Sequence, residues 1–285
     1  MISRNTRPTT SKRVTVRRIA SIGFLILLTT TALAETATEK AWSILNDASS
    51  NSSMEKREQA ITALGLIRKD SHAEELAVKA LSDGKVDVRN AAANALGAMD
   101  ARESIPDLKK ALKDPEISVV LSAAHALLMM KVPAAYEVYY AVLTGQRKSG
   151  QGLLADQRKM LSDPRKLATF GFETGVGFLP FGGIGMTAVK ALTKDDTSPV
   201  RAAAAKILAD DPDPKSGEAL LTATEDKSWL VRAAALDAIA RRGDRSFASK
   251  IEARMDDEKP VVQYVAAAAV LRLNEAPARH LRKKP

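Results

Sequence analysis

The chain has 285 residues, of which 45% are hydrophobic and 27% charged, a balance that excludes both a disordered chain and a bundle embedded in a membrane. Its formal net charge of +9 comes from the two ends: six basic residues precede position 35 and four follow position 278, which leaves residues 35–278 at −1. The basic balance is therefore poor evidence for nucleic-acid binding, which needs a basic stripe on the folded body. There is no Cys, so the core must hold the fold without disulfides.

Residues 1–34 have the three-part layout of a secretory signal. A basic segment without acids is followed by the apolar run IASIGFLILLTTTALA, which ends in the small-residue cleavage pattern Ala32-Leu33-Ala34. The run is shorter than the roughly 20 apolar residues of a membrane span. We therefore expect a signal peptide that is cleaved after Ala34, and an exported protein, either periplasmic or secreted. An uncleaved N-terminal anchor is the alternative.

An internal repeat organises the rest of the chain. Each copy begins with Asp, has Val five residues later, and continues with Ala or Leu at helical spacing. Consecutive copies are 31 residues apart, except once, where the separation is 81 residues. A weaker copy, KREQAITALG, precedes the series at Lys56. The clear copies start at Asp83, Asp114, Asp195, Asp226 and Asp257.

Each copy predicts two antiparallel helices, such as residues 103–113 followed by residues 118–131. One such pair cannot bury both of its faces, but stacked pairs form a continuous core, and the many alanines let neighbouring helices approach closely. We predict an all-α fold, an α-solenoid of about six helix pairs with a central insertion in the middle of the solenoid. The expected parts are repeats at 35–144, the insertion at 145–194, repeats at 195–277 and a basic tail at 278–285.

The repeat resembles the HEAT repeats, particularly the short class found in phycobilisome-lyase subunits. The resemblance extends from about Lys56 to Leu273 apart from the insertion. It implies a surface that binds other proteins, and it names no particular partner.

The repeated Asp and Arg positions are interpreted as structural. Each Asp lies in the turn before a helix, where its carboxylate accepts hydrogen bonds from amides at the helix N-terminus. The family resemblance implies that an Arg six residues later bridges to the Asp of a neighbouring repeat, at Arg89, Arg201 and Arg232. Val120 and Gln263 take the place of this Arg in two copies, so we expect an interrupted ladder.

The sequence contains no recognisable catalytic or metal-binding motif. HEAT-like proteins include a di-iron hydroxylase with paired His-Glu motifs, but here His72, His125 and His280 are not followed by Glu. Residues 183–188 fit G-x-G-x-x-A without the preceding strand that a dinucleotide site requires. We expect no enzymatic activity, no cofactor and no metal. Helix positions equivalent to His125 carry mixed charges, so we also expect no nucleic-acid partner.

Aromatic residues concentrate in and just before the insertion. Two interpretations remain open: the segment plugs a gap in the solenoid, or it is an exposed docking loop, since aromatic side chains are the usual anchors of interfaces. Basic residues before its apolar run also leave peripheral membrane contact open. The candidate partner-binding residues are Tyr136, Tyr139, Tyr140, Phe170, Phe172, Phe178 and Phe181.

Together these features predict an exported, non-enzymatic scaffold that binds another protein through its solenoid surface and its central aromatic insertion. One alternative is an accessory subunit of a lyase-like enzyme, as the resemblance implies. The other is a module that binds a membrane surface peripherally.

Overall fold

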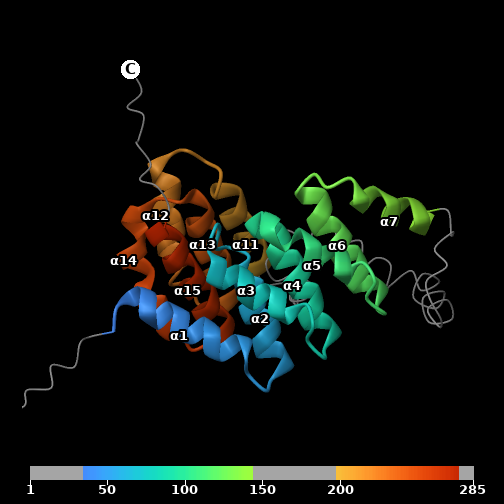
Figure 1. Ribbon diagram of the computed structural model, residues 1–285. Helices are drawn as coiled ribbons and strands as arrows, with labels where there is room; N and C mark the ends of the chain where they lie inside the picture. Colours follow the sequence, from blue (N-terminus) through green and yellow to red (C-terminus); the bar gives the residue numbers. More distant parts are fainter. Residues whose placement is uncertain (1–34, 144–196, 276–285) are drawn as a thin grey trace, which may run out of the picture. The chain divides into compact units, whose positions relative to one another are not determined.

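The computed structural model describes residues 35–143 and 197–275, and every regular element in these two ranges is a helix (Figure 1). The predicted all-α class is confirmed. The first range contains α1 (Ala37–Ser49), α2 (Met54–Leu64), α3 (Ser71–Ala80), α4 (Val86–Met99), the short 3₁₀ helix η1 (Arg102–Ser104), α5 (Ile105–Ala111), α6 (Ile117–Met129) and α7 (Ala134–Leu143). The second contains α11 (Ser198–Leu208), α12 (Pro214–Ala223), α13 (Trp229–Arg242), η2 (Arg245–Phe247), α14 (Ala248–Ile251), η3 (Glu252–Asp256) and α15 (Pro260–Glu275).

The helices form stacked pairs, and this confirms the predicted α-solenoid. We call the second helix of each pair its B helix and the helix before it the A helix; the B helices are α2, α4, α6, α11, α13 and α15. Within each described range the B helices stack in chain order: α2 packs on α4 and α4 on α6, while α11 packs on α13 and α13 on α15. The residues that precede α11 lie outside the described ranges.

Small residues allow the B helices to approach closely. A Cβ atom added to Gly97 of α4 would lie 2.9 Å from the Cα atom of Ala126 in α6, so no larger residue fits without a shift of the helices. In α15 the run Ala266–Ala269 is completely buried. A helix that is apolar on all sides must be covered on all sides, and α15 is therefore an interior helix of the stack.

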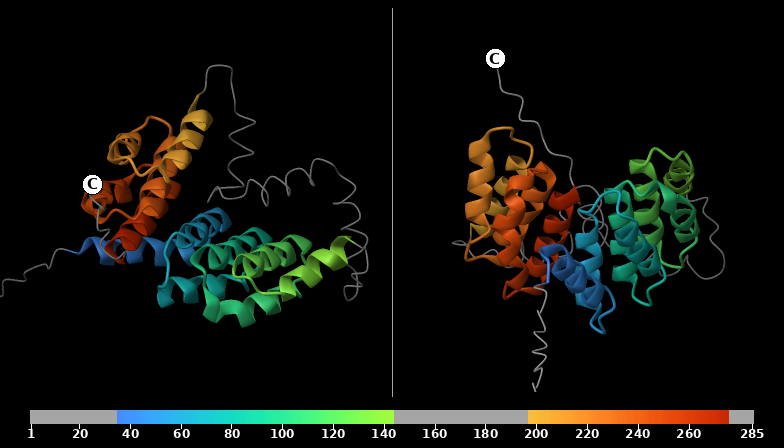
Figure 2. Two further views of the ribbon diagram at one scale, coloured as in Figure 1. Left: turned by 90° about the horizontal axis from the view of Figure 1, so that it is seen from above. Right: turned by 60° about the vertical axis from the view of Figure 1, so that its left-hand side comes forward.

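The neighbours of α15 show how the two ranges join. This last B helix packs against α13 and also against α1 and α2, and the views agree that α15 lies beside α1 and α2 (Figures 1 and 2). Lys40 Nζ of α1 lies 2.7 Å from Asp256 Oδ2 at the end of η3. This salt bridge also links the first described range to the second. The row of B helices thus runs α11, α13, α15, α2, α4, α6. Among the described helices, α11 and α6 lie at the two ends of this row, and the predicted insertion at 145–194 lies outside the described residues.

Arg–Asp pairs connect neighbouring B helices. In each pair the guanidinium group donates two hydrogen bonds to the carboxylate that begins the next repeat, for example Arg89 Nε to Asp114 Oδ2 at 2.8 Å. The pairs are Arg57–Asp83, Arg89–Asp114, Arg201–Asp226 and Arg232–Asp257. Arg57 belongs to the weak first copy and was not recognised from the sequence. Asp195 lies outside the described residues.

The same Asp residues also shape the turn before each B helix. Asp83 Oδ1 accepts a hydrogen bond at 2.8 Å from the backbone N–H of Lys85, the N-cap of α4. Asp114, Asp226 and Asp257 make the equivalent bond to the residue two positions later. Each Asp therefore forms an Asx turn that leads into the helix, two residues earlier than a capping position. The hydrogen bonds from Arg57 hold the pKa of Asp83 below its ordinary value.

Helix α7 packs near the start of α6, where the ladder position carries Val in place of Arg. Val120 stands at the Arg position of this repeat, and it is buried in a small apolar cluster with Leu121, Ala124 and Val138 of α7. Tyr139 packs against the same cluster. An Arg at position 120 would leave a buried charge at this contact, so Val is the residue that lets α7 cover α6.

The ladder pairs differ in burial, and this predicts a difference in their importance for stability. The side chains of Arg232 and Asp257 are 8% and 5% exposed, whereas those of Arg201 and Asp226 are 36% and 20% exposed. We expect Arg232→Ala to lower the free energy of unfolding by about 3 kcal/mol, because Asp257 would remain buried without its partner. Arg201→Ala should cost about 1 kcal/mol. Urea unfolding followed by circular dichroism measures both, and equal losses would contradict the prediction.

Candidate functional site

Two of the three predicted tyrosines lie on the open side of α7. Tyr136 and Tyr140 are each 63% exposed and are separated by one helical turn, so they share a face of the helix. Tyr139 is partly buried against the cluster described above. One tyrosine therefore anchors α7 to the protein, and the other two are accessible to solvent. The predicted Phe170, Phe172, Phe178 and Phe181 lie outside the described residues.

The B-helix position equivalent to His125 carries titratable groups that are partly or fully buried. Burial lowers the pKa of Lys206 to about 8 and also lowers the pKa of His125. Asp237 is 1% exposed; its Oδ2 accepts a hydrogen bond from Arg241 Nε at 2.8 Å, and its Oδ1 has no hydrogen-bond partner in the described part of the chain. Across residues 35–143 and 197–275, no three His, Asp or Glu side chains come together in a group that could hold a metal ion.

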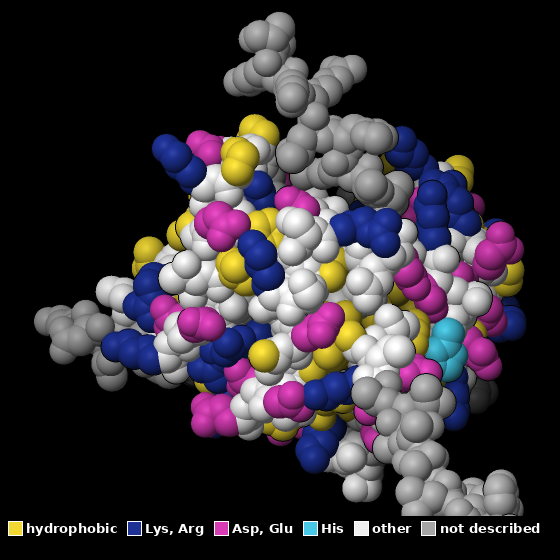
Figure 3. Space-filling model, turned by 90° about the vertical axis from the view of Figure 1, so that its left-hand side faces the viewer, with side chains coloured by type: hydrophobic (Ala, Val, Ile, Leu, Met, Phe, Trp, Pro, Cys, Tyr) yellow, Lys and Arg dark blue, Asp and Glu magenta, His cyan; other side chains and the backbone are white. Residues whose placement is uncertain are grey.

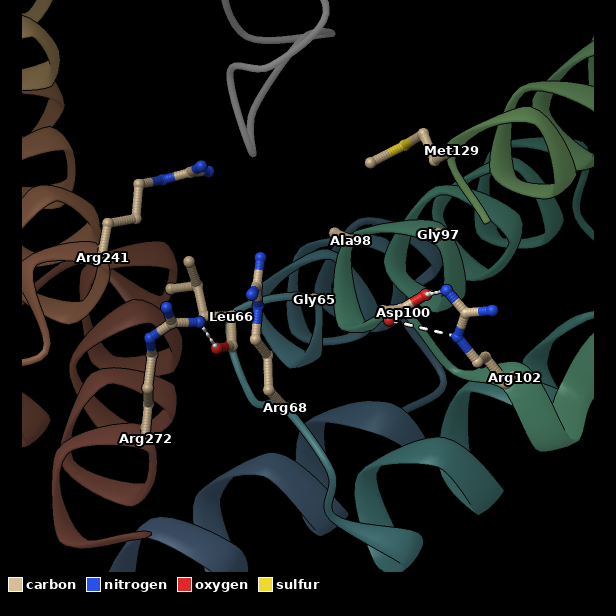
Figure 4. Close-up of a pocket in the computed structure, with 10 residues that line it drawn as sticks. All are labelled: Gly65, Leu66, Arg68, Gly97, Ala98, Asp100, Arg102, Met129, Arg241 and Arg272. Carbon is tan, nitrogen blue, oxygen red and sulfur yellow. Dashed lines mark hydrogen bonds and ion pairs between the residues drawn. The ribbon is translucent and has the colours of Figure 1, made fainter. Parts of the chain in front are cut away.

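A pocket lies one helical turn further along the B helices. It has a volume of about 270 Å³ and is lined by residues from several repeats (Figure 4). Five of them occupy the same repeat position. Ala98, Met129, Arg241 and Arg272 lie fifteen residues after the Asp of their repeats, and Leu66 lies fifteen residues after Asn51, which stands at the Asp position of the first copy. Because equivalent positions line up along a solenoid, successive helices present these side chains side by side. This row lies one turn beyond the position of His125 and was not recognised from the sequence.

The ends of the first two B helices complete the wall of the pocket. Gly65 and Gly97 carry no side chain where α2 and α4 end, and Arg68 follows in the connection to α3. Asp100 ends α4 with a left-handed backbone (φ 56°), and Arg102 Nη2 lies 3.3 Å from its Oδ1. The pocket is thus built at the C-terminal ends of the B helices.

Three guanidinium groups, those of Arg68, Arg241 and Arg272, approach the same space from three consecutive pairs of the row (Figure 4). Arg241 is bound to Asp237, and Arg272 Nη1 donates a hydrogen bond to Leu66 O at 2.6 Å. Arg68 is exposed and makes no hydrogen bond or ion pair with any described residue. Burial lowers the pKa of Arg272 to about 10, and the charges of Arg68 and Arg241 act in the same direction. The site can therefore attract anions, and its guanidinium groups cannot serve as bases at neutral pH.

The charges elsewhere do not form a comparable patch on the face drawn in Figure 3. Lys and Arg side chains alternate there with Asp and Glu, and apolar side chains lie between them (Figure 3). A groove that follows a nucleic-acid backbone would instead present basic side chains in succession. The basic pocket is thus a local feature and does not continue over this face.

A carboxyl pair joins the end of α15 to the start of α3. Glu275 is the last residue of α15, and Asp70 is the N-cap of α3, where its Oδ1 accepts a hydrogen bond from the N–H of Ala73 at 2.8 Å. Removal from water, together with a hydrogen bond to Asp70 and its charge, raises the pKa of Glu275 from 4.5 to about 7. A proton on Glu275 therefore favours this contact between α15 and α3.

A family model for HEAT repeats matches residues 38–128 and 186–271, which together make up more than half of the chain. The chain belongs to the HEAT-repeat family. This confirms the family expected from the repeat, and the second match of the HEAT-repeat model begins within the segment that we had assigned to the insertion. No helix of this HEAT-repeat protein within residues 35–143 and 197–275 is long and apolar enough to cross a membrane.

Two solved structures similar to this HEAT-repeat protein contain enzymes or their subunits. Human deoxyhypusine hydroxylase in complex with glycerol is 19% identical, with 83% of this chain and 84% of that chain covered and a TM-score of 0.30. The complex of CpcE and CpcF of phycocyanin lyase from Nostoc sp. PCC7120 is 22% identical, with 83% and 94% covered and a TM-score of 0.32. No curated protein matches the chain significantly. Neither likeness assigns an activity to this protein.

Substitution of Glu275 by Gln should remove a pH dependence from the stability of the fold. Because the pKa of Glu275 is higher in the folded than in the unfolded chain, its favourable contribution is complete below about pH 4.5 and is lost as the pH rises to about 7. The melting temperature of the unmodified protein should therefore fall more steeply over this interval than that of Glu275→Gln. Glu103→Gln, at an exposed position, is the control and should follow the unmodified protein. Equal slopes for all three proteins would contradict the prediction.

Proposed function

We propose that this HEAT-repeat protein is an exported, non-enzymatic scaffold that binds another protein. The helical repeats supply a rigid surface, because each pair is held by its neighbours through a buried core and the Arg–Asp ladder. The secretory pattern of residues 1–34 supports export. The lack of a recognisable catalytic motif in the sequence supports binding as the function.

The observation that carries the proposal is the pair of exposed tyrosines on α7. Tyr136 and Tyr140 are each 63% exposed on α7, next to the last B helix of the first described range, while Tyr139 packs the same helix against the protein. Tyrosine is enriched among the residues that contribute most to binding, since its ring buries a large apolar area and its hydroxyl forms a hydrogen bond. A helix fixed on one side and aromatic on the other is suited to protein docking. The Phe-rich residues 170–181 follow α7 in the chain and belong to the same proposal.

Crosslinking in the source cells tests this proposal. A photoreactive phenylalanine analogue at position 140 of the full chain is expected to capture a defined polypeptide. The same analogue at the exposed position Lys56 of α2 is the control. Adding Tyr136→Ala to the probe-bearing chain should reduce the capture by about tenfold or more, because an interface tyrosine of this kind contributes ~2 kcal/mol.

The melting temperature of the Tyr136→Ala protein should not change, since this side chain is largely outside the core. If position 140 captures only what position 56 captures, then α7 is not a docking helix. A chain without residues 170–186 then tests the insertion separately. Retained capture by the shortened chain would remove the insertion from the proposal and leave the tyrosines.

A further inference from the structure

The pocket contains more positive charge than its own carboxylates balance. Asp100 pairs with Arg102, and the carboxylate of Asp237 is already bound to Arg241. Within residues 35–143 and 197–275, Arg68 and Arg272 have no carboxylate partner. Guanidinium groups that converge in this way form charge-assisted hydrogen bonds with carboxylates and phosphates. The pocket is therefore equipped to bind an anion.

Arg272 is held in position before any ligand arrives. Its Nη1 donates to Leu66 O at 2.6 Å, across the contact between α15 and the end of α2. Its Nε and Nη2 have no hydrogen-bond partner among the described residues, so two donors remain for a ligand. Arg68 adds a complete guanidinium group from the neighbouring connection. Donors that are already fixed by the protein lose less conformational entropy on binding.

We infer that this pocket binds the carboxylate of an acidic side chain in an extended segment of the protein partner. The inference rests on the proposed function and specifies the chemistry of that partner. The lining also includes the apolar residues Leu66, Ala98 and Met129, of which Leu66 is buried and Met129 is 37% exposed. An Asp or Glu next to an apolar residue matches the arginines and the exposed side chain of Met129. The cavity of about 270 Å³ accommodates side chains, and its cations are confined to one pocket, whereas a polyanion requires basic side chains that continue along the surface.

Peptide binding to the full chain tests the inference. The probe is a short fluorescein-labelled peptide in which Glu residues alternate with Leu and Gly, and its matched control has Gln at every Glu position. Fluorescence anisotropy is expected to give at least about tenfold tighter binding for the Glu peptide. The combined substitutions Arg68→Gln and Arg272→Gln should abolish that preference. Equal binding of the Glu and Gln peptides to the unmodified chain would overturn the inference.

A charge-matched variant separates the pocket from general attraction. Lys85→Gln with Lys227→Gln removes the same charge from exposed positions at the opposite, N-terminal ends of the B helices. This variant should keep the preference for the Glu peptide. If the variant loses that preference, the inference is overturned. Arg68→Gln alone, at an exposed side chain, should weaken binding at least about threefold and covers the case in which the double variant does not fold. A phosphoserine peptide that binds more than about tenfold tighter than the Glu peptide would reassign the pocket to phosphate.

The crosslinking experiment distinguishes a failed inference from a failed function. If position 140 still captures its polypeptide while the Glu peptide does not bind, the pocket is not the acidic-segment site but the scaffold function stands. If neither experiment gives binding, both the inference and the proposed function are wrong.

Discussion

Close approach of the B helices is the constraint on which the rest of the structure depends. Glycine and alanine at the facing positions, such as Gly97 against Ala126, bring the helices near enough for an Arg to reach the Asp of the next repeat. The same spacing brings Arg241 and Arg272 together, although like charges repel. Burial decides the outcome: each buried methylene contributes about 0.8 kcal/mol and the row buries many, whereas repulsion at a wet surface costs about 1 to 4 kcal/mol per close pair.

The ladder is interrupted where the surroundings of a B helix change. Near the start of α6, Val120 packs in an apolar cluster with α7, so an apolar contact replaces the charged one. Where α15 meets α2, both charged members of the ladder are replaced by amides. Gln263 stands for Arg and donates from Nε2 to Asp257 O, while Asn51 stands for Asp and accepts from the N–H of Ser53 at 3.0 Å. The amides keep the hydrogen bonds of each turn, but they form no ion pair between the repeats of α15 and α2.

The sequence predicts the helix pairs well because their determinants are local and recur every 31 residues: the Asx turn at Asp226, the buried Val231, and the alanines behind it. The order of the pairs is not encoded in the same way. Every repeat presents similar apolar faces, so the pattern does not tell whether α15 is a free end or stacks on α2. Gln263 and Asn51 fit either case.

The pocket was not predicted because Arg68 lies in a connection outside the repeated helix positions, and only the stacking of α15 on α2 brings it near Arg272.

The position of the pocket also explains how Arg272 keeps donors available. Arg241 and Arg272 lie in the last turns of α13 and α15, where the unpaired carbonyl groups of a helix carry partial negative charge. Backbone carbonyls, of which Leu66 O is one, therefore offset part of the repulsion between the guanidinium groups. Arg272 is held in this way without a carboxylate, while Arg241 is bound to Asp237. At the other end of the helices each ladder Arg is bound by a bidentate Asp. At the N-terminal ends of the B helices, arginine therefore fixes the repeats to one another. At their C-terminal ends, Arg272 keeps two donors that no described residue accepts.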